Sequence, residues 1–169
     1  MARAKIITSP GGRHSVDVPH SWTINNDRGA DLGHGQVLSA RMRYRIIRDD
    51  REGCGPFRAT TDAYMYELAD GAHELFALYW HPLGNSLEKL PHFHLGDKLL
   101  RDDAPIDSKS HMPMPRASFE QAVRWVIEFK GAVPLVQDWD DRLTVCETRF
   151  KLYRSWHTHP DEATAGKQG

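Results

Sequence analysis

Three histidines within a short stretch are the residues of this chain best suited to chemistry. His92 and His94 lie in the segment LPHFHLG, and His111 opens the segment HMPMPR further along the chain. Side chains alternate between the two faces of an extended strand, so the imidazoles of His92 and His94 point the same way and Phe93 points the opposite way. A loop that returns His111 and Arg116 to this pair would assemble three imidazoles and a guanidinium.

These groups are suited to cleavage of RNA by its own 2′-hydroxyl. Histidine accepts and donates protons near neutral pH, and arginine stabilises negative charge that develops on a phosphate group. The leading hypothesis is therefore a module that cleaves or binds RNA and needs no cofactor. Its predicted catalytic residues are His92, His94, His111 and Arg116.

A stripe of arginines on a predicted strand extends this hypothesis to substrate binding. In the segment GQVLSARMRYRIIRDD, apolar residues alternate with three arginines, which indicates a strand with one apolar and one basic face. The basic face is either a solvated surface or a stripe that binds phosphate groups. Aromatic side chains on the following strands are suited to stacking on unpaired bases. The predicted substrate-binding residues are Arg41, Arg43, Arg45, Tyr64 and Tyr79.

The same histidines also have the spacing of a metal site. A His-x-His pair on a strand presents two imidazoles to one ion, and imidazole nitrogen binds zinc and other divalent transition metals. The alternative is a hydrolase-like protein in which His92, His94 and His111 hold one such ion, with His81 or Asp97 as a fourth ligand. A third interpretation is a non-catalytic interaction protein whose histidines are hydrogen-bonded to the backbone.

The elements that must position these residues predict an α+β domain. The segments GQVLSARMRYRIIRDD, ATTDAYMYELADG and HELFALYWHP alternate in hydrophobicity, and the Asp70-Gly71 pair indicates a hairpin. HFHL is a short fourth strand. Ser118 and Gln121 form a capping box that starts a helix, which ends near Lys130. A second helix, capped by Asp138, carries an apolar face. The predicted residues of that face are Trp139, Leu143, Cys146, Phe150 and Tyr153.

The predicted fold is thus a single domain with a curved antiparallel sheet of about four strands packed against two C-terminal helices. The domain spans residues 1–160, of which 1–35 form a poorly defined N-terminal extension, and residues 161–169 form a disordered tail. The chain of 169 residues has a formal net charge of −1, so no global basic field attracts nucleic acid. No apolar run is long enough to span a membrane, and no signal peptide is visible, which predicts a cytoplasmic protein without a membrane partner.

The order of these elements resembles the TumE-like toxin family of bacterial toxin–antitoxin pairs. The resemblance covers about residues 41–130 and rests on the motif PHFHLG, with His92, His94 and Gly96, followed by a capped helix that begins SFEQAV. It implies a prokaryotic accessory protein that acts on RNA, with His92 and His94 at the centre of its site and an antitoxin protein as its partner.

Overall fold

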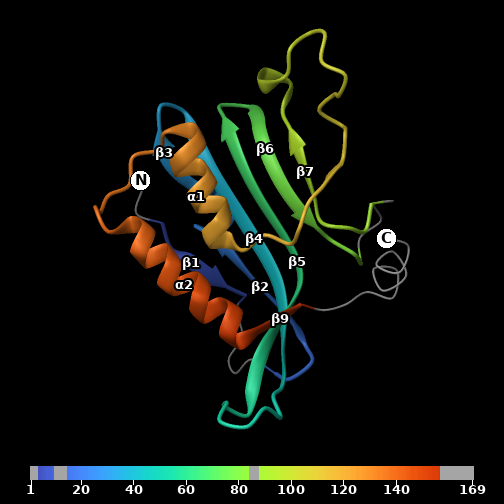
Figure 1. The fold of residues 1–169 in the computed structure, drawn as a ribbon, viewed down its shortest axis with the longest axis vertical. Coiled ribbons are helices and arrows are strands. Elements are labelled where there is room, and N and C mark those ends of the chain that lie inside the picture. The colour runs from blue at the N-terminus through green and yellow to red at the C-terminus, as the bar shows by residue number, and fades with distance from the viewer. Residues whose placement is uncertain (1–3, 10–14, 84–87, 157–169) are drawn as a thin grey trace.

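One large β-sheet with two helices on one of its faces makes up the fold in the computed structural model (Figure 1). The structure describes residues 4–9, 15–83 and 88–156. Within these ranges the elements are β1 (Ile6–Thr8), β2 (Pro19–Ile24), β3 (Ala30–Gly33), β4 (Gln36–Arg48), β5 (Phe57–Asp70), β6 (His73–Trp80), β7 (His92–Leu95), the 3-10 helix η1 (Asp97–Leu99), β8 (Met112–Pro113), α1 (Phe119–Lys130), α2 (Trp139–Tyr153) and β9 (Arg154–Trp156). The α+β class is confirmed.

The sheet is larger than the predicted one. Its main path runs β1-β2-β4-β5-β6-β7-β8, β3 also pairs with β4, and β9 pairs in parallel with β5, which gives nine strands among the described residues. The meander of β4, β5 and β6 and the short strand β7 match the expected strands. The additional β1, β2 and β3 lie within residues 1–35, which the sequence treats as a poorly defined extension. The predicted tail at 161–169 lies outside the described residues.

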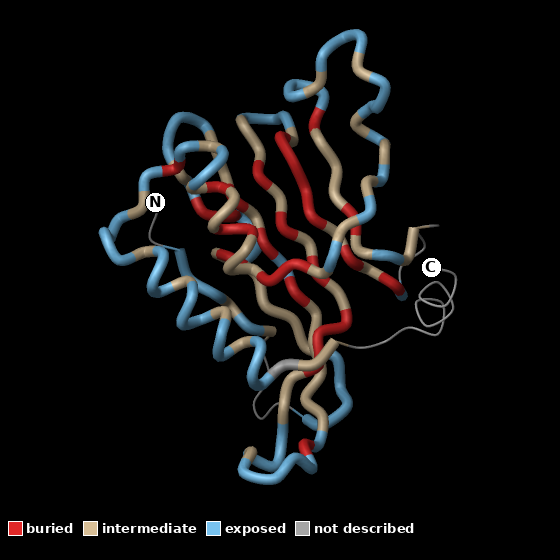
Figure 2. The backbone as a smooth tube through the Cα atoms, viewed as in Figure 1, coloured by how far each residue is buried: buried red, intermediate tan, exposed pale blue. Residues whose placement is uncertain are grey.

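Side chains along the central strands alternate between two faces of the sheet, one covered by the helices and one open. The covered face holds the core, and Figure 2 shows buried residues along the middle of the sheet and in α1. Leu38, Tyr66 and Leu68 are at most 2% exposed. Each fully buried side chain of this size contributes about 1.5–3 kcal/mol. The helices α1 and α2 lie on this face, and most side chains of the opposite face are half-buried or exposed (Figure 1).

The helix α1 starts and ends where the sequence predicts. The Ser118 hydroxyl accepts a hydrogen bond from the backbone N–H of Gln121, and the Gln121 side chain accepts one from the backbone N–H of Ser118. Gly131 ends the helix in the left-handed conformation, with a φ of 69°, which a residue without a Cβ adopts at little cost. The side chains of Val123 and Val126 are buried, and they anchor the helix on the sheet.

The helix α2 is less buried than predicted. Leu143 and Phe150 are partly buried and pack against the core, but no residue of the helix is fully buried. Cys146 and Tyr153 are exposed, so these two members of the predicted apolar face do not pack against the core. The physical reason is that α2 packs against α1 and β9 and not flat on the sheet. Among the described residues, no helix is both long enough and apolar enough to cross a bilayer.

Candidate functional site

The three histidines converge on the open face of the sheet. His92 and His94 lie on β7, and His111 lies directly before β8. The ring centroids are 5.2 Å apart for His92 and His94, 4.7 Å for His92 and His111, and 4.6 Å for His94 and His111. One ring nitrogen from each residue lies within 4.8 Å of the other two. The chain therefore does return His111 to the pair, as the sequence predicts. We call these residues the histidine cluster.

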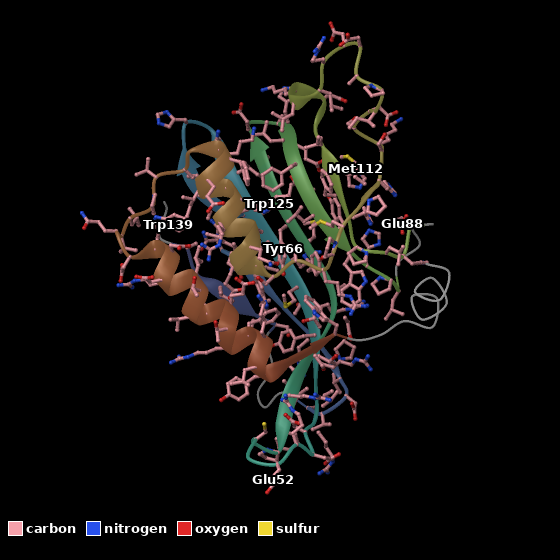
Figure 3. All side chains as sticks on the ribbon, in the orientation of Figure 1. Glu52, Tyr66, Glu88, Met112, Trp125 and Trp139 are labelled. Atoms are coloured by element: carbon pink, nitrogen blue, oxygen red, sulfur yellow. The ribbon has the colours of Figure 1, made fainter. Side chains whose placement is uncertain are left out.

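Strand pairing explains why the three rings share a face. His92 is opposite Tyr79 on β6 and opposite Pro113 on β8. Directly opposed residues of paired strands point to the same face, and residues two apart along a strand do so as well. His111 is two residues before Pro113, so its ring lies on the face that carries His92. Figure 3 labels the next residue, Met112, which is opposite Phe93 and belongs to the covered face.

Backbone carbonyls orient the rings of His92 and His94. The Nδ1 of His92 lies 2.7 Å from the carbonyl oxygen of Leu90, and the Nδ1 of His94 lies 3.3 Å from that of Ser108. A carbonyl oxygen only accepts hydrogen bonds, so each Nδ1 carries the proton and donates it. The Nε2 of each ring is then left with a lone pair. Histidines that bind metals show the same arrangement, in which the second ring nitrogen donates to a carbonyl or a carboxylate.

Burial favours the neutral form of both rings. Burial lowers the pKa of His92, and the neighbouring His111 lowers it further, although the hydrogen bond to Leu90 acts in the opposite direction. Burial likewise lowers the pKa of His94, with a second contribution from His111. A neutral imidazole binds a metal ion and a protonated one does not. His92 and His94 are thus prepared to act as ligands at neutral pH.

The spacing of the cluster is close to that of a metal site. Nitrogen ligands at 2.0–2.1 Å from a tetrahedral zinc ion are about 3.4 Å apart, so the three nitrogens must move together by roughly 1 Å. His92 is buried, whereas His111 is exposed and can make most of this movement. The ring of His81 lies 5.5 Å from that of His92, so His81 is the nearer of the two predicted fourth ligands. Asp97 lies in η1 and does not line the pocket of the cluster.

Glu74 belongs to the same pocket and was not found from the sequence. The pocket has a volume of about 330 Å³, and Glu74, Tyr79, His81 and Ser108 line it together with the cluster. Burial raises the pKa of Glu74, and burial together with Glu74 and Glu67 raises that of Tyr79.

The face on which Glu74 lies could not be predicted from the sequence, because a β-bulge changes it. Glu74 and Tyr79 are five positions apart, which would place them on opposite faces of a regular strand. The register shifts between Leu68 and Ala69 of β5, and Leu75 of β6 has no opposite residue there. The extra residue reverses the alternation, so Glu74 joins the open face. No signal in the sequence marks this position.

Arg116 lies apart from the histidine cluster. Its guanidinium carbon is 4.2 Å from the centre of the Trp80 ring and 5.5 Å from that of Trp156, on the covered face. His111 and Arg116 are five residues apart in an extended segment, and an odd separation puts their side chains on opposite faces. The RNA-cleavage hypothesis requires Arg116 to lie beside the three histidines. The structure does not place it there.

The predicted substrate-binding residues are divided between the two faces. Tyr64 is in the core, where it stacks on Tyr66 at 4.8 Å and its hydroxyl accepts a hydrogen bond from the backbone N–H of Ala117. Its ring therefore packs in the core and is not presented on the open face. Tyr79 is on the open face, and its ring centroid lies 5.3 Å from that of His94.

Two of the three predicted arginines are already paired with aspartates. Arg41 forms an ion pair with Asp27 at 3.0 Å, and Arg45 forms one with Asp62 at 2.9 Å. Arg41 and Arg43 line a groove on the open face. The basic stripe is therefore partly neutralised within the protein itself.

A scan of protein-family models and searches of curated proteins and of solved structures find no match to this chain. The resemblance to the TumE-like toxins thus rests on its motif alone, and it stays a prediction.

Proposed function

We propose that this protein binds one divalent transition-metal ion, zinc being the best fit, through His92, His94 and His111. The observation that carries the proposal is the convergence of one nitrogen from each ring to within 4.8 Å of the others. The carbonyl partners of His92 and His94 support it, because they leave the Nε2 lone pairs for the ion. Three histidine ligands leave a fourth position for a water molecule or a substrate, as in catalytic zinc sites.

The site is suited to hydrolysis. A zinc ion bound there would lower the pKa of a coordinated water molecule to about 7 and so provide hydroxide at neutral pH. Glu74 lines the same pocket, and its raised pKa brings it closer to the range of a general acid or base. The reaction class we propose is therefore metal-assisted hydrolysis.

The RNA-cleaving module remains a second proposal with weaker support. Its acid and base residues converge, but Arg116, which should stabilise the phosphate charge, lies against Trp80 on the other face. An antitoxin partner and a cytoplasmic location are likewise proposals that follow from the sequence. A protein with purely structural histidines would bind no metal at these rings, so one titration separates this interpretation from the metal site.

The test is a calorimetric titration of chelator-treated, tag-free protein with zinc. We expect one equivalent of zinc to bind to the native protein, and binding to be lost in the double variant His92→Ala/His94→Ala. The matched control is His73→Ala, which removes an exposed histidine at the start of β6 and should leave the affinity unchanged. Equal zinc binding by the native protein and the double variant would overturn the proposal.

A further inference from the structure

Arg43 is the arginine of the basic stripe for which the described residues provide no ion-pair partner. Its neighbours along β4, Arg41 and Arg45, are paired with Asp27 and Asp62. In the part of the chain that the structure describes, no ion pair includes Arg43, and its Nε is buried without a hydrogen-bond partner. A buried donor of a charged group is costly to leave unsatisfied, and it is a strong donor for an anion that enters the site.

The groove around Arg43 has the composition of a site for a small organic anion. It has a volume of about 480 Å³, within the range of ligand pockets. Ser21 and Thr23 line it beside Arg43, and Met65 and Leu83 add apolar surface. Asp27 also lines the groove, with its carboxylate paired with Arg41. Ser21 is directly opposite Arg43 in the pairing of β2 with β4. A guanidinium beside hydroxyl donors suits the oxygens of a phosphate group, and the apolar side chains suit an organic body.

This groove leads to the histidine cluster. Tyr79 and His81 line both the groove and the pocket of the cluster. Arg41, Met65, Tyr79 and His92 are successive partners across β4, β5, β6 and β7, so they form one row on the open face. Three strand spacings separate the two ends of this row, which is about 14 Å. Arg43 is two residues from Arg41 on the same face of β4, so a ligand held by Arg43 must carry a body longer than a phosphate ion to reach the histidines.

We infer that the groove binds a small phosphate ester, whose phosphate is held by Arg43 and whose organic part extends over Met65 and Tyr79 towards the histidine cluster. The inference rests on the proposed function, since it names the substrate class of the proposed metal site. The bidentate guanidinium provides most of the affinity for the phosphate, and Ser21 and Thr23 add hydrogen bonds. The metal site then acts on the part of the ligand that lies beyond Tyr79.

The experiment is a binding titration of chelator-treated protein with adenosine 5′-monophosphate and with adenosine, which lacks the phosphate. We expect the nucleotide to bind more tightly than the nucleoside, and Arg43→Gln to weaken nucleotide binding by about tenfold or more. Arg43→Lys retains the charge but not the bidentate geometry, so it should recover part of the affinity. The matched control is Arg48→Gln, which removes one positive charge from the exposed end of the same strand and should change binding by less than about twofold.

The results for the groove and for the metal site are separable. Equal nucleotide affinity in the Arg43→Gln and Arg48→Gln variants would overturn the inference, and so would equal affinity for the nucleotide and adenosine. Zinc titration of folded Arg43→Gln should match that of the native protein. If the native protein binds the nucleotide through Arg43 but binds no zinc, the groove stands as a phosphate site and the proposed metal function fails.

Discussion

Replacing Gly96 with alanine should destabilise the protein and disturb the histidine cluster. Gly96 follows β7 directly, and its backbone N–H donates a hydrogen bond to the carbonyl oxygen of Leu75 on β6, at 2.8 Å. A Cβ at this position would overlap the carbonyl group of Glu74 and would lie 3.3 Å from the Cα of Leu75. These atoms belong to the backbone of a central strand and cannot rotate away.

The magnitude follows from three terms. Forcing a methyl group into a closely packed position costs about 1–3 kcal/mol, and loss of the Leu75 hydrogen bond adds about 1 kcal/mol. Gly96 has a φ of −68°, which alanine also adopts. Alanine has less conformational freedom than glycine in the unfolded chain, and this offsets about 0.4–1 kcal/mol of the loss in stability. The expected net loss in the free energy of unfolding is about 2–3 kcal/mol. The overlap should also push β7 away from β6, and with it His92 and His94.

Urea unfolding of Gly96→Ala and of a matched variant, Gly55→Ala, measures this loss. No atom lies within 4 Å of a Cβ built at Gly55, and its φ is not in the left-handed range. Gly55→Ala should therefore be within about 0.5 kcal/mol of the native protein. If Gly96→Ala is as stable as Gly55→Ala, the close approach of β7 to β6 and the reasoning built on it are wrong. Zinc titration of the folded Gly96→Ala protein should show weaker binding than that of Gly55→Ala.

Three further predictions concern the core, the loop after β4 and the metal. Tyr64→Phe should lower the free energy of unfolding by about 1–3 kcal/mol, because it leaves the buried N–H of Ala117 without an acceptor; urea unfolding beside the exposed-site variant Tyr153→Phe checks this. Hydrogen bonding to Arg51 lowers the pKa of Asp49 to about 2, below the value of about 3.9 in unfolded chains. The ionised Asp49 therefore stabilises the folded state at pH 7, and this stabilisation is lost as the pH falls through about 2. Asp49→Asn should therefore be less stable than the native protein at pH 7, and a series of urea titrations should show the difference shrinking below about pH 4. Zinc at about 1,000 times its dissociation constant should stabilise the native protein by about 4 kcal/mol, and a thermal shift absent from the His92→Ala/His94→Ala variant measures it.

Local signals in the sequence account for the parts of the fold that were predicted well. The helix α1 was predictable because Ser118 and Gln121 cap its first turn and Gly131 ends it, so the information lies within a few residues. The hairpin at Asp70-Gly71 was predictable for the same reason, because an Asp-Gly pair is a local turn signal. Gly71 indeed takes a positive φ of 58°. Such features need no knowledge of distant contacts.

The strands β1, β2 and β3 were not recognised because turn-forming residues surround them. Asn25, Asn26 and Asp27 all have positive φ values, between 49° and 65°, in the short connection between β2 and β3. The sequence around them reads as loop, whereas pairing with β4 makes the flanking segments strands. Tertiary pairing decides the structure of these segments, and it has no local signature.

The candidate site was predicted in part for a similar reason. The His-x-His alternation correctly placed His92 and His94 on one face, and His111 joins them through the pairing of β7 with β8. The same alternation, counted from His111, places Arg116 on the opposite face of the sheet from the cluster. Glu74 could not be assigned, because a bulge in the pairing of β5 with β6 reverses its face.

Anomalous diffraction from crystals grown with one equivalent of zinc tests the proposed metal centre most directly. We expect one zinc peak at about 2.0–2.1 Å from a nitrogen of each of His92, His94 and His111. The Nδ1 atoms of His92 and His94 should still donate hydrogen bonds to the carbonyls of Leu90 and Ser108. A protein that carries zinc elsewhere and shows no peak among these three rings would contradict the proposal.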